Sequence, residues 1–227
     1  MSKQQRRKPG RPKGVTRDPA ERRSDLLAAA ERAIRRHGPG VSMEQIADEA
    51  GVAKATLYDN FDGKHGLTDA LLERYGARVL STIAGGLDRI QTPHDVMRGG
   101  IEVFVAVIEQ ELALYHFVLA ENGSRTMLDE SAAPVAALLG GMMRQAGVDS
   151  GGAEVVARAL LGGVFSAAEW WAQHQTMSRA DFVQYLDDLL WPGLAATGIE
   201  RIDGPVDLSN IARLLADVVP VDDGDPD

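Results

Sequence analysis

Apolar side chains recur every three or four residues along most of this chain, which is the spacing that places them on one face of an α-helix. The pattern predicts a helix from Pro19, two short helices on either side of Gly51, and a longer helix that follows Asp62. Further helices are expected at 93–108, 112–120, 132–146, 152–176, 179–196 and 208–218, with a loop at 121–130. No segment alternates apolar and polar residues as a half-buried strand does, so the expected fold class is all-α.

Capping side chains are expected at the starts of five of these helices, namely Asp18, Ser42, Asp62, Thr92 and Ser178. A side-chain oxygen at such a position accepts a hydrogen bond from a first-turn amide, which has no partner within its own helix. Pro192 falls inside the last long pattern and is expected to kink that helix.

The two short helices around Gly51 form an unusually small unit. In the stretch "GVAKATLYDNF", residues 51–61, Ala53, Leu57 and Phe61 lie four residues apart and are expected to face inward. The opposite face then carries small residues, hydroxyls, an amide and a cation. Two short helices joined at a glycine match the helix–turn–helix pattern, whose second helix enters the major groove of DNA. The alternative is an ordinary helical hairpin with a solvated polar face.

The charge distribution favours the nucleic-acid interpretation. The net charge is −9, yet residues 1–65 hold 14 of the 24 Lys and Arg and only 9 of the 33 Asp and Glu. A basic segment in an acidic chain is typical of proteins that bind nucleic acid or another anionic surface. We therefore expect a disordered basic arm at 1–17, a DNA-binding domain at 18–65, a larger helical domain at 66–220, and an acidic tail at 221–227.

The run "SMEQIADEAGVAKATLYDNFDGKHGL" resembles the N-terminal domain of TetR-type (tetracycline-repressor-like) transcriptional regulators. The resemblance rests on Ile46-Ala47, Ala50-Gly51-Val52, Leu57-Tyr58 with Phe61, and Lys64 with Leu67. A looser similarity to the last two long helices of such regulators covers residues 162–194. The resemblance implies a homodimeric repressor that binds palindromic double-stranded operator DNA and is released by a small-molecule effector, which we expect to be apolar. It also implies that the helical domain at 66–220 is the ligand-binding and dimerisation domain.

The same resemblance, with the outward face of the second short helix, implies a set of DNA contacts. Ala55 and Thr56 allow close approach to the bases, and Thr56 offers its methyl group to thymine. Lys64 and the free amides beside it are expected to bind phosphate. Asp59 departs from the family, where this position is often aromatic or polar; it accepts from cytosine, pairs internally or repels phosphate. The complete set is Ser42, Lys54, Ala55, Thr56, Tyr58, Asn60 and Lys64.

The basic arm contains "KPGRPKG", which resembles the AT-hook, a reader of the minor groove in A·T-rich DNA. The alternative is a nonspecific tail that only adds salt-dependent affinity, and the sequence favours neither. The arm residues expected at the minor groove are Arg6, Arg7, Lys8, Arg11 and Lys13.

The larger domain carries two weaker signals. A set of aromatic, Met and His residues is expected to line an apolar ligand pocket, although core packing explains each of them singly. The pocket candidates are Phe104, His116, Phe117, Met142, Trp170, Trp171 and His174. Small residues along 152–176 suit close helix approach in a dimer, and the alternative is tight packing inside one subunit. The interface candidates are Gly162, Gly163, Ser166, Phe182, Leu186, Leu189 and Leu190.

Several other classes of protein are disfavoured. The chain has no cysteine, its five histidines lack metal-ligand spacing, and no nucleophile-elbow motif is present, so we expect no metal, no cofactor and no enzymatic activity. Apolar runs are too short for a membrane span and no secretory signal is visible, so a cytoplasmic location is expected. Two functions stay open: a ligand-sensing DNA-binding regulator, and a DNA-binding architectural or adaptor protein whose helical domain binds proteins. A cavity in that domain would favour the first.

Overall fold

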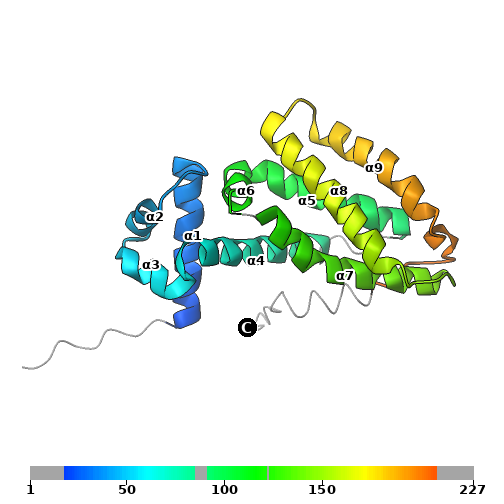
Figure 1. Cartoon of the computed structure of the whole chain (residues 1–227), viewed down its shortest axis with the longest axis horizontal. Helices are drawn as coiled ribbons and strands as arrows, with labels where there is room; N and C mark the ends of the chain where they lie inside the picture. Colours follow the sequence, from blue (N-terminus) through cyan, green and yellow to red (C-terminus); the bar gives the residue numbers. More distant parts are fainter. Residues whose placement is uncertain (1–17, 85–90, 122, 209–227) are drawn as a thin grey trace, which may run out of the picture.

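One long helix joins a small N-terminal unit to a larger helical body in the computed structural model, which describes residues 18–84, 91–121 and 123–208 (Figure 1). Over these three ranges the chain forms helices and no strand, so the all-α prediction is confirmed. No helix within them is both long and apolar enough to cross a membrane.

The N-terminal unit packs three helices around a small apolar core. They are α1 (Pro19–His37), α2 (Met43–Ala50) and α3 (Lys54–Phe61). The expected caps are present, since Asp18 accepts a hydrogen bond from the Ala20 amide and Ser42 forms a capping box with Gln45. Gly51 ends α2 in the left-handed region at φ 66°, where a residue without Cβ meets no steric penalty. This conformation makes the tight turn into α3.

Helix α4 (Gly63–Ala84) begins inside the N-terminal unit and then leaves it for the body (Figure 1). Its first turns bury Leu67 and Leu71 in the core that also holds Leu57 of α3. A Cβ on Gly66 would lie 1.7 Å from the carbonyl oxygen of Phe61. Only glycine therefore lets α4 start this close to the end of α3, so the position of α3 depends on this contact.

The body follows α4 and consists of packed helices. They are α5 (Pro93–Gln110), α6 (Leu112–Leu119), α7 (Gly123–Gln145), α8 (Ala153–His174) and α9 (Arg179–Ala195), with a 3₁₀ turn η2 at Ile199–Arg201. One core lies between α5, α8 and α9 and includes Val105, Phe165 and Phe182. A second core joins α7, α8 and η2 through Leu139 and Ile199.

Helix α6 connects the body to the N-terminal unit. Its Leu114, Phe117 and Val118 are buried in the same apolar core as residues of α1 and α4. The N-terminal unit and the body therefore share a continuous core. A shift of α4 or α6 would change the side-chain packing of both parts.

Some of the expected elements differ from the structure. Residues 121–130 are not a loop, because α7 begins at Gly123. Met127 packs against both the N-terminal core and the core of α5, α8 and α9, an apolar contact that the polar composition of this segment conceals. Ala53 does not face inward: it is exposed at the N-cap position of α3, so only Leu57 and Phe61 anchor that helix.

Other expectations concern the chain ends and Pro192. Helix α9 contains Pro192 and continues to Ala195. The basic arm at 1–17, the acidic tail at 221–227, and all but the first residue of the helix expected at 208–218 lie outside the described residues.

Candidate nucleic-acid interface and internal cavity

The outer face of α3 consists of the residues that its two buried anchors leave exposed. Leu57 and Phe61 are 0% and 3% exposed and fix one side of the helix in the N-terminal core. Ala55 and Tyr58 are exposed on the helix, whereas Thr56 is partly buried. Small side chains near the start of α3 let its backbone approach a partner closely.

Lys54 and Tyr58 are held by a contact between α3 and α2. The Lys54 ammonium forms an ion pair with Glu44 in the first turn of α2 and lies 5.6 Å from the centre of the Tyr58 ring. The hydrogen bond raises the pKa of Lys54 and lowers the pKa of Glu44. A phosphate arriving at this surface would compete with Glu44 for the same cation.

Ser42 and Asn60 combine a predicted DNA contact with a structural role. The Asn60 side-chain amide donates to the Thr56 carbonyl at 2.7 Å, which stabilises the last turn of α3. The Ser42 hydroxyl accepts from the Gln45 amide at 3.3 Å and still has its own proton to donate to a phosphate. Asp59 is exposed on α3.

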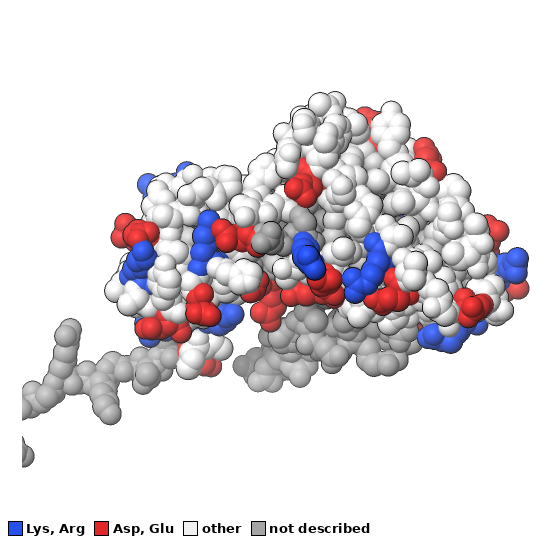
Figure 2. All heavy atoms as spheres, viewed as in Figure 1, with Lys and Arg blue, Asp and Glu red and all other residues white. Residues whose placement is uncertain are grey.

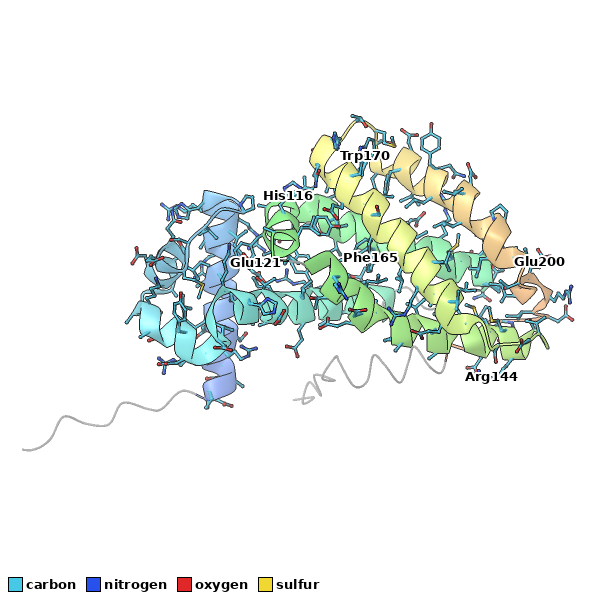
Figure 3. The ribbon with its side chains drawn as sticks, in the orientation of Figure 1. His116, Glu121, Arg144, Phe165, Trp170 and Glu200 are labelled. Carbon is cyan, nitrogen blue, oxygen red and sulfur yellow. The ribbon has the colours of Figure 1, made fainter. Side chains whose placement is uncertain are left out.

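Lys64 links the N-terminal unit to the body. Its ammonium lies 3.1 Å from a carboxylate oxygen of Glu121 and 5.0 Å from the centre of the Phe117 ring. Figure 3 shows Glu121 on the side of the body that faces the N-terminal unit. The residue expected to bind phosphate is therefore paired with an acid of the body in this structure.

A buried carboxylate ties α1 to α4. Glu31 is 4% exposed and lies 3.0–3.3 Å from Arg35, Arg74 and Arg78. Arg35 also donates to Glu111 at the start of α6, at 2.7 Å. These opposite charges compensate for the cost of burying Glu31. The sequence reasoning did not single out Glu31, although an acid on the apolar face of the first helix was the available signal.

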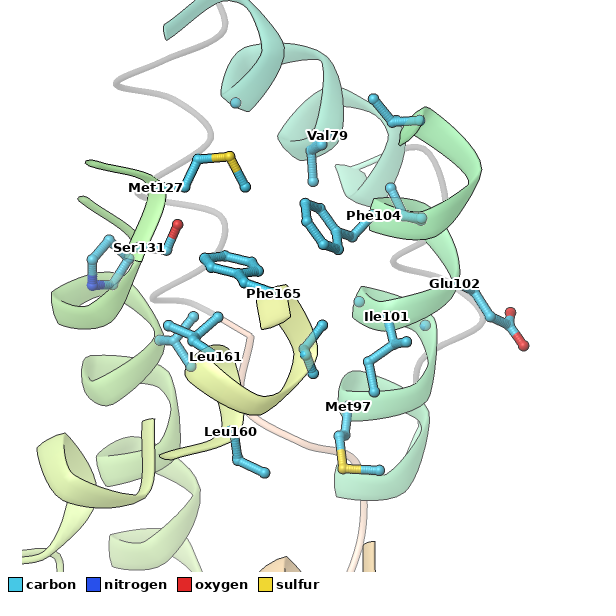
Figure 4. Close-up of a pocket in the computed structure, with 18 of the residues that line it drawn as sticks. Val79, Met97, Ile101, Glu102, Phe104, Met127, Ser131, Leu160, Leu161 and Phe165 are labelled. Atoms are coloured by element: carbon cyan, nitrogen blue, oxygen red, sulfur yellow. The ribbon is translucent and has the colours of Figure 1, made fainter. Parts of the chain in front are cut away.

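A cavity of about 1010 Å³ lies in the body, lined by α4, α5, α6, α7, α8 and α9. Figure 4 shows Val79, Phe104, Met127 and Phe165 converging on this space from four different helices. A mostly apolar space of this size with few polar groups is typical of a small-molecule site. The cavity meets the criterion that favours a sensor over an adaptor protein.

Only two of the seven predicted pocket residues, Phe104 and Met142, line this cavity. His116 and Phe117 lie on α6 but do not line it, and Phe117 is buried in the N-terminal core. Helical spacing identified the apolar side of α6 but not the neighbour that this side contacts.

The other three predicted pocket residues lie near the end of α8. Trp171 is buried against Phe182, with 5.2 Å between the ring centres. Trp170 is exposed and stacks on His174 at 5.0 Å, and Figure 3 shows it nearer than Phe165 to the end of α8. The prediction that Trp170, Trp171 and His174 line one pocket with Phe104 was therefore wrong.

Two tyrosines that the sequence reasoning did not assign to a pocket line the cavity. Tyr75 on α4 and Tyr115 on α6 each carry a buried hydroxyl without a hydrogen-bond partner. Burial raises the pKa of both phenols. Leaving such a group unsatisfied costs about 1–3 kcal/mol. The available signal was the position of Tyr75, four residues after Leu71 on a buried helix face.

The outer sides of α8 and α9 expose an unusual amount of apolar surface. Val155, Trp170, Tyr185 and Leu189 are 72%, 45%, 66% and 72% exposed. Apart from Tyr58 on α3, they are the exposed large hydrophobic residues of the described ranges. Figure 2 shows few charged side chains over α8. Exposed apolar side chains of this kind are typical of interaction surfaces.

The predicted interface residues divide between this surface and the interior. Gly163, Ser166 and Leu189 are exposed and Gly162 is partly exposed, and a Cβ on either glycine would meet nothing within 4 Å. Packing inside one chain therefore does not require the small residues. The interface prediction was wrong for the other three residues. Phe182 and Leu186 are buried in the core of α5, α8 and α9, and Leu190 packs against that core.

Comparison with known proteins matches both the N-terminal unit and the body to models of related regulatory proteins. Residues 26–71 match the family model "Bacterial regulatory proteins, tetR family", and residues 82–206 match "Tetracyclin repressor-like, C-terminal domain". An uncharacterized HTH-type transcriptional regulator of Mycobacterium tuberculosis is 32% identical over 198 residues, which cover 82% of each chain. The HTH-type transcriptional activator FasR of Mycolicibacterium smegmatis is 28% identical over 190 residues, 80% of this chain and 86% of that protein.

Solved structures share the fold. A putative transcriptional regulator from Pseudomonas aeruginosa PAO1 matches with a TM-score of 0.55 and 24% identity, covering 83% of this chain and 97% of the other. A tetR-family transcriptional regulator from Streptomyces coelicolor matches with a TM-score of 0.56 and 18% identity, covering 87% and 92%.

Proposed function

The chain belongs to the TetR family of DNA-binding transcriptional regulators, which are not enzymes, and we propose that it is a repressor released from DNA by a small apolar molecule. The observation that carries the proposal is that α4 packs at one end against α3, the proposed DNA-binding helix, and lines the cavity along the rest of its length. A ligand in the cavity thus contacts the helix that positions α3.

In this proposal α3 enters the major groove. Ala55 and Thr56 approach the bases, while Lys54, Tyr58 and Lys64 bind phosphates or base edges. The pairs Lys54–Glu44 and Lys64–Glu121 are exchanged for phosphate contacts when DNA binds. Ser42 and Asn60 contribute to the same surface, and the Lys and Arg residues of 1–17 add positive charge that favours DNA binding.

Two copies bind a palindromic operator as a homodimer joined through α8 and α9. The exposed Val155, Trp170, Tyr185 and Leu189, together with the open Gly162 and Gly163, support this interface. An isologous pairing of one apolar surface buries it in both copies and gives the two α3 helices a fixed spacing.

The DNA-binding part is tested with an operator recovered by selection from random duplexes. Lys54→Ala and Lys64→Ala should weaken binding to every sequence and reduce the salt slope by about one each, because a lost phosphate contact releases one counterion fewer. Arg179→Ala is the matched control, since it removes a cation that pairs with Glu109 on the body. Wild-type slopes in both lysine variants would contradict the assignment.

The regulatory part is tested with a reporter gene whose promoter overlaps the selected operator. Repression by the chain, relieved by a cavity ligand, is the expected result. Increased transcription in the presence of the chain would contradict a repressor role while leaving DNA binding intact.

A further inference from the structure

We propose that the cavity selects largely apolar molecules that carry one positive charge, such as long-chain amines, with the charged group beside Glu73 of α4 and Glu130 of α7. This inference rests on the proposal that the cavity is the effector site, and it adds the charge of the effector.

The interior of the cavity suits the hydrocarbon part of such a molecule. Figure 4 shows Leu160 and Leu161 of α8 and Met97 and Ile101 of α5 around the space, while Glu102 points away from it. These side chains hold a hydrocarbon chain through contacts that have no direction, so they do not distinguish one head group from another. Selectivity for the head group therefore depends on the charged residues of the lining.

Several charged side chains of the lining are already paired. Arg98, the only Lys or Arg among the described lining residues, donates to Asp187 at 2.7 Å and to Glu102 at 3.1 Å. Asp95 accepts hydrogen bonds from the amide and the hydroxyl of Thr92, both at 2.8 Å. A carboxylate ligand would lose its hydration here without gaining an unpaired cation.

Glu73 and Glu130 are the lining charges without such compensation. Both are exposed, and neither forms an ion pair or a hydrogen bond with a described residue. Burial and the negative charges of Asp69 and Glu73 raise the pKa of Glu130, so these carboxylates repel one another. A positive group beside them would offset that repulsion, which a neutral group cannot do.

The two glutamates also define where the head group lies. They line both the cavity and a second hollow, which Tyr58 and Asn60 of α3 line as well. The one described cation of this second hollow, Arg23, already donates to the Asn60 carbonyl at 3.3 Å. Its carboxylates are Asp59, Asp62, Asp69, Glu73 and Glu130. A cationic head group is therefore attracted to the side of the cavity nearest α3, and its chain extends into the body.

The test compares three probes that share a ten-carbon chain and differ in charge, namely decylammonium, 1-decanol and decanoate. Isothermal titration of the full chain at low salt, with each probe below its micelle-forming concentration, measures binding. The affinity should fall in that order, and decylammonium should bind at least about tenfold more tightly than decanoate. Each exposed carboxylate changes the binding of a charged group only a few-fold, but two of them act together and with opposite effects on the two ions.

Glu73→Gln and Glu130→Gln keep the size of each side chain and remove its charge. The two changes combined should weaken decylammonium about three- to tenfold and leave 1-decanol nearly unchanged. Glu109→Gln combined with Glu200→Gln is the matched control, because it removes two charges from exposed residues that line neither hollow. Gly100→Leu occupies the cavity and should abolish the binding of all three probes.

Any of five results would overturn the inference. They are no binding of decylammonium, equal affinity for decylammonium and decanoate, full decylammonium affinity in the Glu73→Gln and Glu130→Gln chain, the same loss in the control chain, and undiminished binding in Gly100→Leu. Circular dichroism of each variant verifies that the fold is retained.

Release of operator DNA is measured separately with the same probes. Because a cationic probe can also bind DNA, only release that Gly100→Leu abolishes is assigned to the cavity. Charge-selective binding in the cavity without DNA release leaves the inference standing and contradicts the proposed function. Release through the cavity by all three probes at equal concentrations does the reverse.

Discussion

Lys64 is proposed to bind operator phosphate, and in this structure it pairs with Glu121 of the body, so DNA and the body would compete for the same cation. The two side chains are 35% and 30% exposed, so the pair is worth only a fraction of the energy of a buried one. We predict that Glu121→Gln raises operator affinity about two- to fivefold at low salt, because Lys64 no longer has to leave a carboxylate to reach phosphate. Fluorescence anisotropy with labelled operator measures the change.

A control separates this competition from net charge. Glu109→Gln removes the same negative charge from a residue that pairs with Arg179 of α9 and not with Lys64. It should change operator affinity less than Glu121→Gln does. Equal gains in the two variants would show that only the total charge of the body matters.

Residues on the outer surface of α3 were easier to predict than residues of the cavity. A short amphipathic helix has one buried side, so Leu57 and Phe61 alone identify the outward position of Tyr58. The cavity is assembled from six helices, and its lining depends on how each of them is rotated against the others. Periodicity therefore found Phe104 but placed Trp170 and Trp171 in the wrong location, and it did not reveal that Tyr115 lacks a partner.

At the level of elements, the contact between α3 and α4 depends on Gly66. Adding a Cβ there would place it 1.7 Å from the Phe61 carbonyl oxygen, so backbone atoms must move. We predict that Gly66→Ala destabilises the DNA-binding domain by about 1–3 kcal/mol or more, as other overpacked substitutions do. Thermal unfolding gives the change in stability, and operator binding should weaken in parallel because α3 loses its support.

Gly76 provides the matched control on the same helix. A Cβ at this position would meet nothing within 4 Å. Gly76→Ala should therefore stabilise α4 by up to about 1 kcal/mol through the higher helix propensity of alanine. A similar loss of stability in both variants would mean that the close approach at Gly66 is not the cause.

The sequence predicted most helix starts because their signals are local. Asp18, Ser42, Thr92 and Ser178 each bond a first-turn amide of the helix that follows. The start of α7 was missed because what favours a helix at 123–130 is the packing of Met127 against two separate cores. Tertiary contacts of that kind cannot be predicted from a short stretch of sequence alone.

For the whole molecule, the exposed apolar surface of α8 and α9 predicts a homodimer. Gly163→Arg should shift the protein to monomers in sedimentation velocity, because a charged side chain would project from the centre of this surface. The monomer itself should be no less stable, since arginine has a helix propensity about 1 kcal/mol better than glycine. Operator affinity should fall together with dimerisation.

Ala180→Arg adds the same side chain to an exposed position on α9. It lies about 140° around the helix from the exposed Tyr185, given 3.6 residues per turn. This variant should remain dimeric. A monomer in both cases, or a dimer in both, would argue against an interface centred on α8 and the Tyr185 side of α9.

We expect coupling between the cavity and the DNA surface to involve the whole molecule, because α4 and α6 contribute side chains both to the cavity lining and to the core of the DNA-binding domain. A ligand releases DNA only if it binds the non-binding conformation more tightly, and operator DNA must then weaken ligand binding by the same factor. We predict that saturating operator lowers ligand affinity about 5- to 150-fold in isothermal titration, the usual range of such coupling. Gly100→Leu, at a cavity-lining glycine whose Cβ would meet nothing within 4 Å, should abolish ligand binding by occupying the space while operator affinity is retained. Equal ligand affinities with and without operator would show that the cavity and the DNA-binding helix are independent, whatever the cavity binds.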